Sequence, residues 1–339
     1  MADLLKRYGL VPDLSKRFSI SFVDNFVDCS YRVFLSYFMG LWPERQRGFT
    51  RIFGTGCHRG LAAVNKLVSE SFENELCSKC LNPCKLWTVQ KVEAMKVPLE
   101  KCAVKQLMMD EFFKEFTPEF EEAALREEKD KPIDEIKEEI LDHHRYAYNC
   151  MCSTMFESQP VGEVLMTEEM LKGTLGDHNI LGQVDLALGI QQGDKIPKTL
   201  VVDYKTTGTM PTKKLPIRQL ALYVHLLEQK GLTVNGVSAI YMVKKDPPKV
   251  KRKNSKDFLQ SKTFFESLDR DRTGYKMALD GIKEDMDQIA DAISCGNFVR
   301  NRNSMFCESC DQKKYCENPY LLDKAIEMGQ TKVTKNKKD

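Results

Sequence analysis

Charged side chains interrupt two apolar segments in which they would be costly to bury. In VVDYKTTG, Asp203 and Lys205 stand two residues apart in a run typical of a β-strand. Because side chains alternate across a strand, these two project from one face and Tyr204 from the other. In GQVDLAL, Asp185 interrupts a second strand-like run. We expect two adjacent strands that each present one carboxylate.

Two carboxylates on neighbouring strands would form an oxygen-rich site suited to Mg²⁺ or Mn²⁺. Beside such a site, Lys205 could orient an attacking water while the cation stabilises charge that develops on a phosphate. That combination is suited to phosphodiester hydrolysis. A D-x-K triplet at the end of a strand is also typical of a solvated turn, so the triplet alone does not define a site.

Three further side chains occur in an order that extends this pattern. Gln219 and Tyr223 stand four residues apart in RQLALYVHLLEQ, so they share one face of a predicted helix. His58 directly follows the small residues of FGTGC, a setting that suits a metal ligand or a phosphate-facing group. An ordinary helix surface and a buried histidine are the alternatives.

Hydrophobic periodicity predicts the elements that would position these residues. Helical spacing begins at Ser19 in a segment that carries Cys29, resumes around His58, and returns between Tyr275 and Ile293. The strand-like segments are 161–166, 181–190, 200–204 and VSAIYMVKK, with the helix 218–229 before the last of them. Strand, helix and strand in succession predict a parallel crossover unit in an α/β fold.

Composition and charge limit the class of protein. The chain has 339 residues, of which 42% are hydrophobic and 29% charged, as in soluble globular proteins. No apolar run is long enough to cross a bilayer and no signal sequence is convincing, so we expect a cytoplasmic protein with no membrane partner. The net charge is only +2, so any nucleic-acid partner must be argued from local sites.

Twelve cysteines are unusual in a chain expected to stay in a reducing compartment, where close spacing indicates metal or redox chemistry. Near the C-terminus, Cys307, Cys310 and Cys316 have C-x2-C-x5-C spacing. A second cluster contains Cys77, Cys80 and Cys84. These three either bind a second metal, with Cys102 or the CMC pair (Cys150 and Cys152) as the source of the fourth ligand, or remain free thiols.

Four segments, taken in order, resemble the PD-(D/E)xK nuclease superfamily and specifically its RecB-like branch. They are GTGCH at 54–58, GQVD at 182–185, VDYK at 202–205 and QLALY at 219–223. The resemblance implies a restriction-endonuclease-like fold, with a central mixed sheet flanked by helices. It also implies roles for individual residues: His58, Asp185, Asp203 and the carbonyl of Tyr204 as metal ligands, Lys205 assisting the attacking water, and Gln219 and Tyr223 supporting the site and contacting DNA.

Cys29, taken with Cys307, Cys310 and Cys316, resembles the one-plus-three arrangement of the iron-sulfur exonucleases in this branch, such as the CRISPR-associated adaptation exonuclease and the AddB and Dna2 nuclease domains. The resemblance implies a 4Fe-4S cluster that joins the N-terminal and C-terminal segments. Four thiolates would also satisfy a structural Zn²⁺, and their spacing in the sequence does not separate the two.

These patterns give an expected organisation. We expect residues 1–339 to form a single nuclease domain that contains a helical insertion at 66–159. A cysteine-cluster segment at 294–325 would pair with Cys29, and 326–339 would be a flexible tail.

The expected function is that of a metal-dependent DNA exonuclease acting on single-stranded DNA or DNA ends in recombination, repair, or phage- or CRISPR-related processing. The basic segment KKDPPKVKRKNSK would either track phosphates or be an ordinary solvated connection. No Walker motif is present, so unwinding would need a helicase or another recombination or CRISPR partner protein. The alternative is a nucleic-acid-binding or assembly subunit that keeps the fold without cutting.

Overall fold

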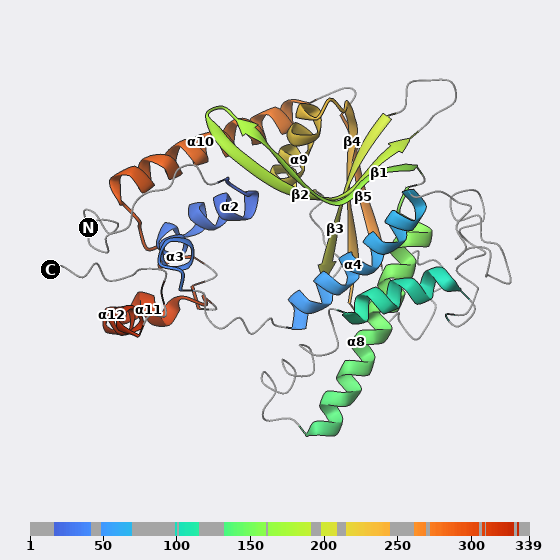
Figure 1. Ribbon diagram of the computed structural model, residues 1–339, viewed down its shortest axis with the longest axis horizontal. Coiled ribbons are helices and arrows are strands. Elements are labelled where there is room, and N and C mark those ends of the chain that lie inside the picture. Colours follow the sequence, from blue (N-terminus) through green and yellow to red (C-terminus); the bar gives the residue numbers. More distant parts are fainter. Residues whose placement is uncertain are drawn as a thin grey trace. The chain divides into compact units, whose positions relative to one another are not determined.

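In the computed structural model, the chain folds into two compact units, whose helices and strands are labelled in Figure 1. One comprises Met1–Gln46, Leu171–Gly182 and Thr273–Asp339, and the other comprises Arg47–Met170 and Gln183–Arg272. The described residues are 17–41, 49–69, 99, 102–114, 132–160, 162–190, 198–208, 215–244, 261–268, 272–304, 307–308, 310–328 and 331. Among the helices in these ranges, none combines the length and apolar character that a membrane span requires.

A five-stranded mixed sheet has the order β1-β2-β3-β4-β5. Its strands are β1 (Glu163–Leu175), β2 (His178–Ile190), β3 (Lys198–Thr207), β4 (Val234–Val243) and β5 (Ser261–Ser267). β3 pairs antiparallel with β2 and parallel with β4, and helix α9 (Ile217–Gln229) connects the parallel pair. The predicted crossover unit and the mixed sheet are therefore confirmed.

β5 was not predicted from the sequence. It pairs antiparallel with β4 at the edge of the sheet, and most of its side chains are wholly or partly exposed. An edge strand buries neither face fully, so its sequence SKTFFES lacks the continuous apolar run that marks β2, β3 and β4.

Alternation along β3 divides its side chains between two different environments. Leu200, Val202 and Tyr204 are buried in a core that also contains apolar side chains of helix α4 (Phe49–Ser69) and helix α8 (Ile133–Ser153). Asp203 and Lys205 occupy the alternate positions, on the face that α9 covers. The strand thus has an apolar side that stabilises the fold and a charged side available for chemistry.

Much of the described part of the expected insertion, 66–159, is helical. A helix covers 103–114, α8 follows, and the π-helical turn η3 (Thr154–Ser158) leads to the sheet. Met108, Phe112 and Met151 are fully buried in the same core as the sheet. These helices therefore contribute to the hydrophobic core that supports β3. Cys77, Cys80 and Cys84 lie outside the described residues, as does KKDPPKVKRKNSK beyond Lys244.

The glycines that precede and follow His58 allow close helix packing. A Cβ atom at Gly56 would lie 2.7 Å from the Phe112 ring, and one at Gly60 would lie 2.6 Å from the Met108 carbonyl oxygen. Both separations are too short for real contacts, so only glycine lets α4 approach the helix at 103–114 this closely. Gly56 and Gly60 therefore serve helix packing, whereas the sequence suggested that the small residues before His58 suit a metal-binding or phosphate-facing histidine.

Gly60→Ala should destabilise the protein by about 1–3 kcal/mol because the new methyl group overpacks a rigid helix contact. Denaturant unfolding of the full chain would measure the change. Gly274→Ala is the matched control, since its Cβ would meet nothing within 4 Å. Equal stability of the two variants would contradict the packing explanation.

The other unit contains helices from both ends of the chain. They are α2 (Ile20–Asp28), α3 (Ser30–Val33), the π-helical turn η1 (Phe34–Phe38), α10 (Thr273–Cys295), α11 (Lys313–Glu317) and α12 (Pro319–Glu327). Ser19 caps α2 by accepting a hydrogen bond from the Phe22 amide at 3.2 Å, as its position in the sequence predicts. Cys29 has extended backbone angles and separates α2 from α3.

Candidate metal site and cysteine pocket

Three side chains from three different elements gather at the sheet. α4 carries His58, β1 carries Glu168 and β2 carries Asp185. Across the described residues, these three form the one set of His, Cys, Asp or Glu side chains whose ligand atoms all lie within 4.8 Å of one another. His58 Nδ1 is 3.2 Å from Glu168 Oε1 and 3.5 Å from Asp185 Oδ1. One imidazole and two carboxylates are suitable donors for a divalent cation.

Charge at this cluster favours a cation. Burial disfavours the protonated form of His58, but Asp185 and Glu168 outweigh this effect and raise the pKa of His58 to about 10. The imidazole is therefore held as a cation between two carboxylates at neutral pH. Its 26% exposed side chain leaves the cluster accessible from solvent.

Asp185 is fixed by the backbone of the neighbouring strand. The amide of Tyr204 donates to Asp185 Oδ2 at 2.7 Å, and Asp185 is buried. The β2–β3 ladder runs as far as the pair Leu186 and Val202, immediately before Asp185 and Asp203. The two aspartates thus stand together at the point where regular pairing ends, as predicted for adjacent strands.

Asp203, Lys205, Gln219 and Tyr223 form one connected hydrogen-bonded chain. Lys205 Nζ donates to Asp203 Oδ1 at 2.9 Å and to Gln219 Oε1 at 2.8 Å. Gln219 Nε2 donates to the Tyr223 hydroxyl at 2.6 Å. The crossover connection brings α9 over β3. Gln219 on the helix and Asp203 on the strand, which are distant in sequence, therefore both bind the ammonium group of Lys205.

Asp203 is fully buried, and burial is the main cause that raises its pKa to about 7. The charge of Asp185 raises it further, whereas Lys205 lowers it. Asp203 Oδ2 is buried without a hydrogen-bond partner among the described residues, although Lys205 Nζ lies 2.9 Å away. This oxygen is thus ion-paired with Lys205 but accepts no hydrogen bond in the described part of the chain, so it keeps a lone pair with which it could bind a cation.

The hydroxyl group of Tyr204, on the face of β3 opposite Asp203, belongs to a buried polar network. This hydroxyl donates to Gln159 Oε1 at 2.5 Å and accepts from Asn65 Nδ2 at 3.3 Å, while Gln159 donates to Asn65 at 3.0 Å. Asn65 is on α4, two turns beyond His58. The network therefore links the histidine helix to the strand that carries Asp203 and Lys205.

The predicted residues fall into two adjoining groups. His58 and Asp185 belong to the cation cluster, and Asp203 and Lys205 form an ion pair next to it. Tyr204 contributes its amide and hydroxyl to hydrogen bonds, and the role of its carbonyl as a metal ligand stays a prediction.

Glu168 was missed because the predicted strand ended at Met166. The signal available in the sequence was the pair Glu168–Glu169 in an otherwise β-prone segment. Glu168 also has a positive φ of 49°, a costly conformation for a residue with a side chain.

Mn²⁺ binding should strengthen as pH rises, because the cation must displace protons from its ligands. With pKa values of about 10 for His58 and about 7 for Asp203 in the metal-free site, both are protonated below neutrality. The Mn²⁺ affinity should then rise up to about 100-fold per pH unit below pH 7 and about tenfold per unit above it. Calorimetric titration with Mn²⁺ at several pH values below and above pH 7 would measure the affinity. A pH-independent affinity would contradict the assignment of these ligands.

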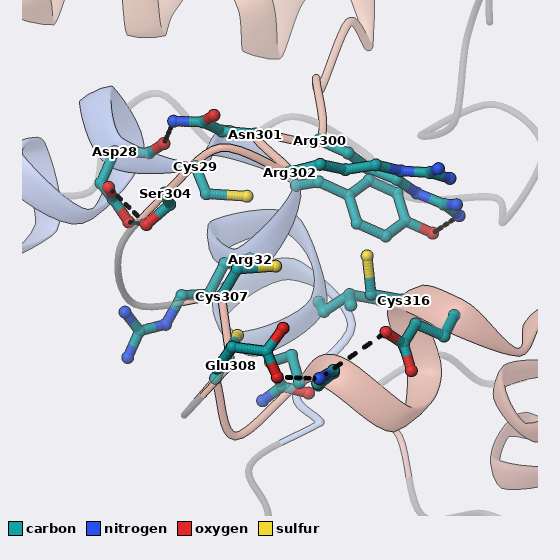
Figure 2. Close-up of a pocket in the computed structure, with 16 residues that line it drawn as sticks. Asp28, Cys29, Arg32, Arg300, Asn301, Arg302, Ser304, Cys307, Glu308 and Cys316 are labelled. Carbon is teal, nitrogen blue, oxygen red and sulfur yellow. Dashed lines mark hydrogen bonds and ion pairs between the residues drawn. The ribbon is translucent and has the colours of Figure 1, made fainter.

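The second site is a pocket of about 310 Å³ that Cys29, Cys307, Cys310 and Cys316 line (Figure 2). Its walls come from the start of α3, the segment after α10, and α11, all within one unit. Gln312, between Cys310 and Cys316, is buried and donates to Ser36 Oγ at 3.2 Å. The C-terminal cysteine segment is therefore tied to the N-terminal helices through side chains that are not cysteines.

Two of the thiols in the pocket have raised pKa values. Burial raises the pKa of Cys310, opposed in part by a hydrogen bond from the Gln312 backbone and by Arg32. Burial also raises the pKa of Cys316, opposed in part by Arg300. In the absence of metal these two thiols therefore favour the protonated form, and a bound metal would have to displace their protons.

The remaining described cysteines, apart from the exposed Cys295, are buried in the core around the sheet. Cys57, Cys102, Cys150 and Cys152 form no disulfide with any described cysteine and are packed among apolar side chains. Cys150 Sγ donates to the Val243 carbonyl at 3.1 Å, and burial raises its pKa to about 12. This setting fits packing thiols, the second of the two readings that the sequence left open for Cys102 and the CMC pair.

A mixed sheet with a cation cluster and an adjoining D-x-K strand defines a divalent-metal-dependent nuclease fold. The model of the PD-(D/E)XK nuclease superfamily matches residues 17–317, and the chain belongs to that superfamily. A search of curated proteins found no match. Among solved structures, the chain is similar to one titled "Crystal structure of SSO0001", with 13% identity and a TM-score of 0.27, over 76% of this chain and 93% of that one.

Proposed function

We propose that the protein is a DNA exonuclease of the RecB-like iron-sulfur branch, acting on single-stranded DNA or DNA ends. The observation that supports this most is the gathering of His58, Asp185, Asp203 and Lys205 within one compact unit of a chain that belongs to a nuclease superfamily. Recombination, repair, and phage- or CRISPR-related processing are the proposed settings, with a helicase or another recombination or CRISPR protein as the proposed partner.

In this proposal His58, Glu168, Asp185 and Asp203 hold a Mg²⁺ or Mn²⁺ ion. When bound, the ion would supply positive charge that stabilises the phosphate during hydrolysis. Lys205 is anchored by Asp203 on one side and Gln219 on the other, so its ammonium group has a fixed position for orienting the attacking water. Tyr223 holds Gln219 and is the proposed contact to DNA.

The four-cysteine pocket is the proposed site of a 4Fe-4S cluster, and Zn²⁺ is the alternative. In the described part of the chain, no three of these sulfurs all lie within 4.8 Å of one another. A tetrahedral zinc with Zn–S bonds of about 2.3 Å would require separations of roughly 4 Å. A four-iron cluster binds each thiolate to a different iron, so wider spacing fits it better.

End dependence tests the proposed activity directly. With Mn²⁺, the full chain should degrade end-labelled single-stranded DNA, and a chemical block at one end should stop digestion from that end. Circular single-stranded DNA of the same sequence should resist. Rapid cleavage of the circle would indicate an endonuclease, and binding without cleavage of either substrate would favour the non-cleaving subunit.

A further inference from the structure

The segment that follows α10 is hydrogen-bonded along the N-terminal helices beside Cys29. The Tyr31 amide donates to the Val299 carbonyl at 3.1 Å, and the Val299 amide donates to Ser30 Oγ at 2.7 Å. Asn301 Nδ2 donates to the Asp28 carbonyl at 2.8 Å. Residue 300 is therefore held between two anchored neighbours, so its side chain has a defined starting point.

The side chain of Arg300 is clamped by one aromatic residue. Its guanidinium carbon lies 4.5 Å from the centroid of the Tyr31 ring, and its Nη2 donates to the Tyr31 hydroxyl at 3.3 Å. Arg300 is one of the residues that line the pocket (Figure 2). A stacked and hydrogen-bonded guanidinium loses little further freedom when it makes another contact.

One hydrogen-bond donor of this clamped group has no acceptor. Arg300 Nε is buried and makes no hydrogen bond with any part of the chain that the structure describes. Leaving a buried donor unpaired is destabilising, and more so for a charged group, so such groups need an explanation. The pocket that Arg300 lines holds the four cysteine sulfurs, and a metal-bound thiolate would be an acceptor.

We propose that Arg300 donates its Nε–H to a sulfur of the metal centre that Cys29, Cys307, Cys310 and Cys316 bind. This inference rests on the proposed cysteine centre and adds a positioning residue to it. The hydrogen bond and positive charge would slow loss of the metal and, in an iron-sulfur cluster, favour the reduced state, because reduction adds negative charge beside the guanidinium.

Two Arg300 variants separate the hydrogen bond from the charge. Arg300→Gln removes both, whereas Arg300→Lys keeps the charge and loses Nε–H. Arg302→Gln is the matched control, because Arg302 lines the same pocket and its side chain is exposed. Release of metal to a chelator from the purified full chain should accelerate about tenfold or more in both Arg300 variants, and less than about twofold in Arg302→Gln.

If Arg300 had only a structural role, its substitution would lower the stability of the metal-free protein as much as that of the metal-loaded protein. We expect Arg300→Lys to lower the melting temperature of the metal-loaded full chain by more than that of the metal-free chain, which loses only the contacts to Tyr31. An equal fall in both forms, wild-type release rates, or equal effects of Arg300→Gln and Arg302→Gln would overturn the proposal. Metal analysis of the wild type tests the iron-sulfur assignment separately, since the chelator assay works with either iron or zinc.

If the centre contains iron, its reduction potential gives a second readout. Redox titration should show a lower potential in both Arg300 variants than in the wild type, since the N–H donor to sulfur is lost in both. A potential unchanged in both variants would contradict the hydrogen bond. Failure of DNA cleavage alone would not bear on Arg300, because the candidate catalytic residues belong to the other compact unit.

Discussion

Lys205→Ala is expected to reduce Mn²⁺-dependent DNA cleavage by about a thousandfold, a loss typical of removing a group that acts on the attacking water or the developing charge. Lys205 donates to both Asp203 and Gln219, so its ammonium group is held in one position beside the buried carboxylates. Single-turnover cleavage of end-labelled DNA would measure the loss, and DNA binding should change little.

Lys230→Ala is the matched control for this loss, because it removes the same charge from the exposed end of α9. Asp203→Asn should be as inactive as Lys205→Ala, and combining the two should cost little more, since the pair acts as a unit. Retention of most activity by either single variant would reject the assignment of this pair.

Cys310→Ser is expected to abolish the metal centre in the pocket and to lower the stability of the unit that contains it. An iron-sulfur cluster needs all four thiolates, and the binding energy of a structural metal centre contributes to folding. Anaerobically purified wild-type protein should be brown and contain about four iron atoms per chain. The serine variant should be colourless and melt at a lower temperature.

Cys295→Ser is the control for this effect, because Cys295 is exposed and does not line the pocket. It should keep both colour and melting temperature. Iron retained in full by Cys310→Ser would remove that residue from the ligand set. Stoichiometric zinc in colourless wild-type protein would replace the iron-sulfur assignment by the zinc alternative.

The sequence predicted those helices and strands that have a strong hydrophobic pattern or a helix-capping residue. The apolar runs that Asp185 and Asp203 interrupt predicted both strands, and helical spacing around Gln219 predicted α9 and therefore the parallel pairing. The partly exposed edge strand β5 lacks that pattern, so it could not be found in this way.

The sequence predicted those candidate-site residues whose side-chain chemistry and order along the chain both fit one site. It missed residues that only tertiary structure brings to the site. Lys205 and Gln219 are fourteen residues apart, and spacing on a strand and a helix placed each on the correct face. Glu168 joins His58 only because β1 lies beside β2 and its backbone takes an unusual conformation. The packing role of Gly56 and Gly60 was not predicted, because their packing partner, the helix at 103–114, cannot be inferred from local sequence.

If the proposed site is correct, one divalent cation binds between α4 and the two strands that carry Asp185 and Asp203. Crystals of the full chain grown with Mn²⁺ would locate the cation by its anomalous diffraction. We expect one strong peak within bonding distance of His58, Asp185 and Asp203, and no such peak in Asp185→Asn. A peak only at another location, or no peak at saturating Mn²⁺, would exclude this site.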